Sequence, residues 1–137
     1  MGAIIRTAAW FDATVVLLGE GCADLLNPKT VRATMGALFH LPVCRNVILP
    51  DTLDKLKERG FAIAVAAADG SPDWRSWSDA PRSALLLGSE AHGVAQQLRE
   101  HAGSILAIPR QGAGESLNVA VTAGVFLSAT LHSSAKS

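Results

Sequence analysis

A glycine-bounded loop, GSEAHG at residues 88–93, follows a short apolar run and precedes a helix-like segment. A loop between a strand and a helix is where many α/β proteins bind a nucleotide. The loop does not match GxGxxG, because Glu90 stands where the second glycine would be. A carboxylate there would repel a pyrophosphate, which argues against NAD and favours a ligand without phosphates. The alternative is a tight turn that binds nothing.

A second glycine-containing loop, residues 109–115, precedes the long apolar segment near the C-terminus. Ser116 can cap the helix predicted there, because its hydroxyl can accept a hydrogen bond from a first-turn N–H. Asn118 is harder to explain, since asparagine is a poor helix former and stands beside an otherwise apolar face. Its side chain either points into a site or is satisfied within the first helical turn.

Arg6 interrupts an apolar helical stretch over residues 3–11. It is either the solvent-facing residue of that helix or a permanent cation that holds a phosphate or a ribose. This segment and the two loops are the places where the sequence can carry chemistry.

The elements that must position these residues alternate between strands and helices. β-Branched apolar runs predict strands buried on both faces. Early acids and late basic residues predict the helix over residues 51–59, capped by Asp51 or Thr52. The expected strands are residues 13–18, 43–49, 61–67, 83–87 and 104–108, the expected helices are 3–11, 30–38, 51–59, 94–101 and 117–132, and residues 69–82 are expected to be a loop. This order is typical of an α/β domain with a mostly parallel sheet. Ligands then bind beyond the carboxyl ends of strands, here after Leu87 and Ile108.

The composition limits the class of protein. A chain of 137 residues fits one domain, and 49% hydrophobic with 18% charged residues excludes intrinsic disorder. Twelve basic and twelve acidic residues give no net charge, so a nucleic acid would have to be bound by a local patch. Cys22 and Cys44 have no zinc or CxxC spacing and are expected to be buried or idle thiols. The apolar stretch 119–131 is too short to span a bilayer, no signal peptide is evident, and a cytoplasmic location is expected.

The chain resembles the SpoU (TrmH-type) RNA ribose 2′-O-methyltransferases of the SPOUT superfamily. The resemblance rests on GAIIRTA (2–8), LLLGSEAHG (85–93) and IPRQGAGESLNVAVTAG (108–124), in that order, and extends to residues 27–39. It covers nearly the whole chain and implies one α/β domain, residues 1–137, with a mostly parallel sheet and a deep trefoil knot. The family's first motif begins with Asn-x-Gly after a strand. Neither precedes Gly2 here, so the domain is expected to lack its first strand.

The resemblance also implies a site and its ligands. S-adenosylmethionine would be bound in the knot, largely by backbone groups, at Leu87, Gly88, Glu90, Gly93, Ile108 and Leu117. The catalytic residues would be Arg6, Ser116 and Asn118. Arg6 would orient the ribose and stabilise the developing alkoxide rather than act as a base, because a guanidinium stays protonated. The contacts to the RNA would come from Arg6, Arg32 and Arg110, and no metal is implied.

The expected function is therefore methylation of a ribose 2′-hydroxyl in tRNA or rRNA. The alternative is a catalytically silent SAM- or RNA-binding module on the same scaffold, and a dinucleotide-binding protein is disfavoured by Glu90. A homodimer is expected, because the helix over residues 117–132 is apolar nearly all round and a domain of this size cannot bury every face. The interface is expected to include this helix, with Phe126 among its contacts, and the Arg6 segment.

Overall fold

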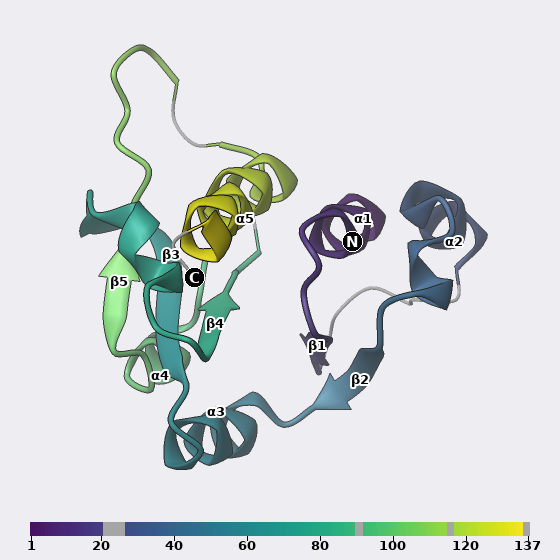
Figure 1. Cartoon of the computed structure of the whole chain (residues 1–137), viewed down its shortest axis with the longest axis horizontal. Helices are drawn as coiled ribbons and strands as arrows, with labels where there is room; N and C mark the ends of the chain where they lie inside the picture. Colours follow the sequence, from purple (N-terminus) through teal and green to yellow (C-terminus); the bar gives the residue numbers. More distant parts are fainter. Residues whose placement is uncertain (21–26, 90–91, 115–116, 136–137) are drawn as a thin grey trace.

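The computed structural model describes residues 1–20, 27–89, 92–114 and 117–135, and its strands form two parallel sheets (Figure 1). One sheet pairs β1 (Val16–Gly19) with β2 (Val43–Val47). The other has the order β4 (Ser83–Leu86), β3 (Ala62–Ser71), β5 (Ser104–Leu106). All the pairings are parallel, which confirms the predicted α/β class. The described strands, however, lie in two sheets rather than one.

Helices connect these strands and pack against them. In chain order, the helices of the described residues are α1 (Gly2–Trp10), α2 (Pro28–Thr34), the 3-10 helix η1 (Ala37–Phe39), α3 (Leu49–Glu58), the 3-10 helix η2 (Trp74–Ser78), α4 (Gln96–Arg99) and α5 (Val119–Ala135). The first and last of them, α1 and α5, lie side by side although they are at opposite ends of the chain (Figure 1).

Several helix boundaries differ from the prediction for local backbone reasons. α2 ends at Thr34 rather than at residue 38, because Met35 (φ 51°) and Gly36 (φ 89°) are left-handed and interrupt the helix. α3 begins at Leu49, which puts Pro50 in the first turn, where its missing N–H has no partner to lose. The predicted cap by Asp51 or Thr52 is therefore wrong, and the residue before α3 makes no side-chain cap.

β3 is the central strand and runs further than predicted. Beyond residue 67 the pairing shifts, so that Leu106 of β5 is opposite both Ala66 and Ser71. A Cβ on Gly70 would lie 2.6 Å from the Ile105 carbonyl oxygen, so only glycine allows this close approach. Residues 69–71 thus belong to the sheet, and the rest of the predicted loop contains η2. By contrast, β2 is not buried on both faces, since Cys44, Arg45 and Asn46 are exposed.

Two clusters of buried side chains form the core. The first joins α1, β1 and η1, and the second lies between the three-stranded sheet, η2 and α5. Leu127 of α5 packs against both clusters. In the second cluster, Trp74 meets Phe126 edge-on at 5.9 Å between ring centroids, and Trp77 Nε1 donates a 2.6 Å hydrogen bond to the Phe126 carbonyl oxygen. The two tryptophans of η2 therefore fix α5 on the sheet.

The face of α5 that points toward the sheet is more completely buried than the sequence predicts. Phe126 is only 1% exposed and belongs to the core, so its expected place in a dimer interface is wrong. The apolar residues that α5 leaves exposed are Val121 and Leu131.

Replacing Phe126 with alanine should lower the free energy of unfolding by about 3–5 kcal/mol, because the change removes a buried ring and leaves a cavity. The control, Lys57→Ala on the exposed surface of α3, should alter stability by about 0.5 kcal/mol or less. Chemical denaturation followed by circular dichroism measures both values. Equal effects of the two substitutions would contradict the assignment of Phe126 to the core.

Candidate functional site

The loops that follow β4 and β5 lie at the same edge of the three-stranded sheet. Both strands run parallel to β3, one on each side of it, so their carboxyl ends point the same way. Leu87 and Ile108, the residues predicted to begin the site, are half-buried where the loops leave the sheet. The structure therefore brings the two glycine-containing loops to one edge, as the sequence predicts.

The first loop folds back tightly on itself. The Gly93 N–H donates to the Ser89 carbonyl oxygen at 2.8 Å, and the His92 N–H donates to Ser89 Oγ at 3.1 Å. A Cβ on Gly88 would lie 2.1 Å from the Gly93 carbonyl carbon, so Gly88 cannot carry a side chain here without moving the backbone. Gly93 has φ 65°, a left-handed conformation that favours glycine. Both glycines are thus required by the loop itself, and Glu90 lies outside the described residues.

The second loop is closed by its own arginine. Arg110 Nη1 donates a hydrogen bond to the Gly114 carbonyl oxygen, and Gly114 has φ 129°, in the range that favours glycine. Residues 109–114 are otherwise exposed, and Ser116 lies outside the described residues. Arg110 therefore braces the loop while its side chain stays exposed.

Asn118 is the residue that caps α5. Its Oδ1 accepts a 2.8 Å hydrogen bond from the Ala120 N–H, the second residue of the helix. The sequence left two explanations for Asn118 open. For the Oδ1 atom the second is correct, because its hydrogen bond lies within the first turn of the helix. The side chain is exposed, and no described residue accepts a hydrogen bond from its Nδ2 group. Leu117, beside it, is 51% exposed. Asn118 can thus cap α5 through Oδ1 and still present its Nδ2 group as a hydrogen-bond donor.

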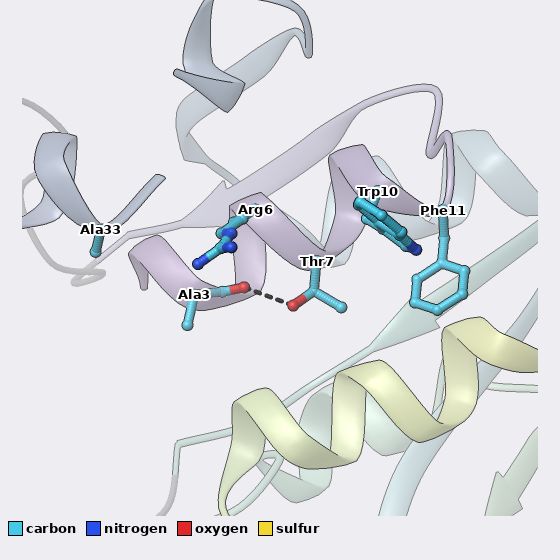
Figure 2. Close-up of a pocket in the computed structure, with 6 residues that line it drawn as sticks. All are labelled: Ala3, Arg6, Thr7, Trp10, Phe11 and Ala33. Carbon is cyan, nitrogen blue, oxygen red and sulfur yellow. Dashed lines mark hydrogen bonds between the residues drawn. The ribbon is translucent and has the colours of Figure 1, made fainter. Parts of the chain in front are cut away.

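Arg6 lies in a different place, an open groove of about 410 Å³ between α1 and α2 (Figure 2). The residues that line this groove are Ala3, Arg6, Thr7, Trp10, Phe11 and Ala33. α1 and α2 meet closely at its end, since a Cβ on Gly2 would lie 2.4 Å from the Ala33 Cβ. No described residue of either glycine-containing loop lines this groove, so within one chain Arg6 stands apart from the other predicted site residues that the structure describes. Arg32 is exposed in the last turn of α2, next to Ala33.

One ion pair supports the loop edge of the sheet. Arg99 Nη2 of α4 lies 2.8 Å from Asp69 Oδ2, in the extended end of β3. This side-chain hydrogen bond, with help from the backbone, lowers the pKa of the Asp69 carboxyl. The sequence pattern does not predict this pair, because only the extension of β3 brings the two residues together. Trp10 is a further residue near Arg6 that was not among the predicted site residues, although its spacing of four residues from Arg6 places both on one helix face.

The part of the chain that the structure describes contains no group of three His, Cys, Asp or Glu residues arranged to hold a metal ion. Among the same residues, no helix has the length and apolarity needed to cross a membrane. The parallel strands, with two glycine-containing loops at one carboxyl edge, define an α/β domain of the type that binds a nucleotide or nucleoside.

Comparison with known proteins identifies the family. The chain matches the SpoU rRNA Methylase family over residues 1–128 and belongs to it. It is 37% identical over 127 residues to the Bacillus subtilis 23S rRNA (guanosine(2553)-2'-O)-methyltransferase RlmP, with 93% of this chain and 51% of that protein covered.

Solved structures agree with the family assignment. An rRNA methyltransferase from Sinorhizobium meliloti with bound AdoMet has TM-score 0.85 at 34% identity, covering 96% of this chain and 51% of that one. The SpoU methyltransferase AviRb from Streptomyces viridochromogenes, in complex with AdoMet, has TM-score 0.88 at 27% identity, covering 99% and 56%. The chain thus spans about half the length of these relatives.

Two substitutions of Asn118 test whether its side chain caps α5. Asn118→Ala removes the cap of α5 and should lower the free energy of unfolding by about 1 kcal/mol. Asn118→Asp keeps an oxygen acceptor at the helix start and should retain the parent's stability, since a carboxylate is favourable there. Thermal and chemical denaturation of the two variants test this assignment, and equal loss of stability in both would contradict it.

Proposed function

We propose that this chain is the methyl-transferring domain, residues 1–137, of an S-adenosylmethionine-dependent enzyme that modifies a ribose 2′-hydroxyl in tRNA or rRNA. The observation that carries the proposal is the pair of glycine-containing loops at one sheet edge in a member of the SpoU family. The similarity to a named rRNA 2'-O-methyltransferase and to two proteins crystallised with AdoMet supports it.

The loop edge suits S-adenosylmethionine. Leu87, Ile108 and the exposed Leu117 offer apolar surface to an adenosine, and Gly88 and Gly93 leave backbone groups uncovered. These five residues and Glu90 make up the proposed cofactor site. The Glu90 carboxylate is compatible with the positive charge of the sulfonium group of the cofactor. When bound, the cofactor supplies an activated methyl group together with its leaving group.

The chain's own residues would position the RNA and stabilise its negative charge. Arg6 carries a permanent positive charge, which would hold the ribose and its phosphate and stabilise the oxygen as the hydroxyl proton leaves. Asn118 would donate from Nδ2 to the nucleotide while its Oδ1 caps α5. Ser116 would assist Asn118 in placing nucleotide and cofactor. Arg32 and Arg110, both exposed, would extend the contacts to neighbouring phosphates.

We further propose that the C-terminal part of the chain forms a deep trefoil knot, as the family resemblance implies. The close packing of α5 on η2, through Trp77 and Phe126, supports it because it brings the last helix against the connection between β3 and β4. A cytoplasmic location is proposed as well, because the proposed RNA substrates are found there.

A homodimer would complete the site. Val121 and Leu131 of α5 are 52% and 61% exposed, and pairing about a two-fold axis would cover them on both copies. Because Arg6 shares no groove with the described residues of the loops in its own chain, a second copy would bring its Arg6 segment to them.

Gly88→Leu should weaken S-adenosylmethionine binding more than about tenfold, because a side chain at this position displaces the Gly93 backbone and fills the loop. Gly103→Leu is the matched control. Gly103 precedes β5 at the opposite end of the strand, and a Cβ there is 3.7 Å from its nearest neighbour. Isothermal titration calorimetry measures both affinities, and circular dichroism checks folding. Undiminished affinity in Gly88→Leu would place the cofactor elsewhere.

Arg6→Ala should lower kcat for methyl transfer by about 100-fold at saturating RNA, since the lost charge acts mainly in the transition state. The affinity for S-adenosylmethionine should stay unchanged. Arg45→Ala, an exposed arginine of β2, is the control and should keep the parent rate. Transfer of a labelled methyl group to total RNA is the assay. Cofactor binding by the parent chain without any transfer would support the silent binding module instead.

Sedimentation equilibrium should give twice the 14.3 kDa chain mass at micromolar concentration. Val121→Asp should shift this mass toward one chain and keep the fold, because the charge would be buried only in the dimer. A single-chain mass for the parent protein would refute the dimer.

A further inference from the structure

The single-turn helix α4 has little to anchor it, although it lies next to the first glycine-containing loop. Only Val94 and Ala95 separate its first residue from Gly93, the last residue of that loop. None of its four residues is buried, and the residue before it makes no side-chain cap. So short a helix is not stable by itself, because one turn makes few hydrogen bonds for the residues that it orders. The position of α4, and with it the end of the loop, therefore depends on contacts made by side chains.

Two ion pairs hold the C-terminal end of α4, and they lead to different elements. Arg99 Nη2 lies 2.8 Å from Asp69 Oδ2, in the extended end of β3. His101 Nδ1, just after the helix, lies 2.8 Å from Asp54 Oδ1 of α3. α3 precedes β3 and contributes to neither glycine-containing loop. The two pairs thus share α4 but differ in what they attach it to.

Asp69 lies close to the contact that fixes the end of β5. Ala66 and Ser71 of β3 both pair with Leu106. Asp69 lies in the segment between them, which bulges out of the regular ladder. The Ser71 carbonyl oxygen then accepts a 2.7 Å hydrogen bond from the Ala107 N–H, and the second glycine-containing loop begins two residues later. A shift of the bulge would therefore move the base of the second loop.

The Arg99 side chain is held in place by this pair. It is 21% exposed, whereas the side chain of Asp69 is 67% exposed. Among the described residues, Asp69 is the hydrogen-bond acceptor for this guanidinium, and the Arg99 Nε atom is buried without a partner. Because the hydrogen bond lowers the pKa of the Asp69 carboxyl, both partners are charged at neutral pH. An arginine committed in this way fixes the distance between the two elements that it connects.

We propose that the Arg99–Asp69 pair is a positioning contact that sets the spacing between the two glycine-containing loops, and thereby the affinity for S-adenosylmethionine. The inference rests on the proposed function, in which the cofactor contacts both loops at once. α4 directly follows the first loop, and the bulge of β3 holds the base of the second, so the pair connects the two loops through side chains. Neither residue would touch the cofactor or the reacting atoms.

Asp69→Ala should weaken S-adenosylmethionine binding about fivefold, because a partly exposed ion pair contributes only modestly to a bound geometry. At saturating cofactor, methyl transfer should keep the parent kcat, since the reacting groups are unchanged. Asp54→Ala is the matched control. It removes the other carboxylate that holds α4, on an element that contributes to neither loop, and it should keep the parent affinity. Isothermal titration calorimetry measures the affinities, and circular dichroism checks folding.

A double-mutant cycle tests whether the two residues act as a pair. Arg99→Met keeps a long side chain without the charge, and it should weaken binding to a similar extent as Asp69→Ala. The double variant should bind no more weakly than either single variant, because each change already breaks the same contact. Effects that add up in the double variant would contradict a shared role.

Equal cofactor affinity of Asp69→Ala and the parent would overturn the proposal and leave the proposed function intact. Equal weakening by Asp54→Ala would also overturn it, because only the anchoring of α4 would then matter.

Hydrogen exchange tests the spacing of the loops without any cofactor. Asp69→Ala should speed exchange of the Gly93 and Ala107 amides, one at each loop, by more than about threefold, and Asp54→Ala should not. Faster exchange in a parent chain background that binds no S-adenosylmethionine would support the link between the loops and refute the proposed cofactor site. Unchanged exchange at both amides would overturn the link itself.

Discussion

Leu127 of α5 packs against both clusters of buried side chains, and this contact joins two sheets that share no strand. α5 is held from both sides. Trp74 and Trp77 fix it on the three-stranded sheet through Phe126, and α1 lies along it with Thr7 next to Gly124. The position of the Arg6 groove relative to the loop edge therefore depends on one apolar helix. Because α5 has no broad polar face and is packed on both sides, a small change in its packing would alter both the Arg6 groove and the loop edge of the sheet.

The same helix connects the core to the proposed chemistry. α5 begins at Asn118, whose oxygen is used to start the helix and whose amide nitrogen remains available to a ligand. The preceding loop is closed by Arg110, and the other loop depends on the close contact between Gly88 and Gly93. Both loops are thus shaped mainly by their own backbones. A site built in this way can recognise a ligand through backbone groups, with few charged side chains committed to it.

Four arginines are held by neighbouring groups of the chain. Arg75 stacks over the Trp74 ring at 4.3 Å, Arg99 pairs with Asp69, and Arg82 and Arg110 donate to backbone carbonyl groups. Arg6 differs from these four, since it stands in a groove with an aromatic neighbour and has no partner among the described residues. In a chain without net charge, binding of an anionic polymer would depend on such local positions rather than on the whole surface.

Local patterns in the sequence were sufficient for the parallel α/β class and the place of the two glycine-containing loops. Apolar runs of strand length and helical periodicity are short-range features, and the carboxyl edge follows from parallel pairing. The family resemblance likewise rests on contiguous motifs, and the match over residues 1–128 confirms it. The roles of individual residues within the site remain proposals.

Tertiary structure decided what depends on residues far apart in the chain. The burial of Phe126 requires η2, which precedes it by about fifty residues, and the extension of β3 requires its pairing with β5. Backbone conformation likewise ended α2 at Thr34, and Pro50 shifted the start of α3. The grouping of Arg6 with Ala33 follows from the packing of α1 on α2, as does its separation from the described residues of the loops. Sequence periodicity specifies which face of a helix is apolar, but only the packed chain determines which neighbour covers that face and which residues it leaves exposed.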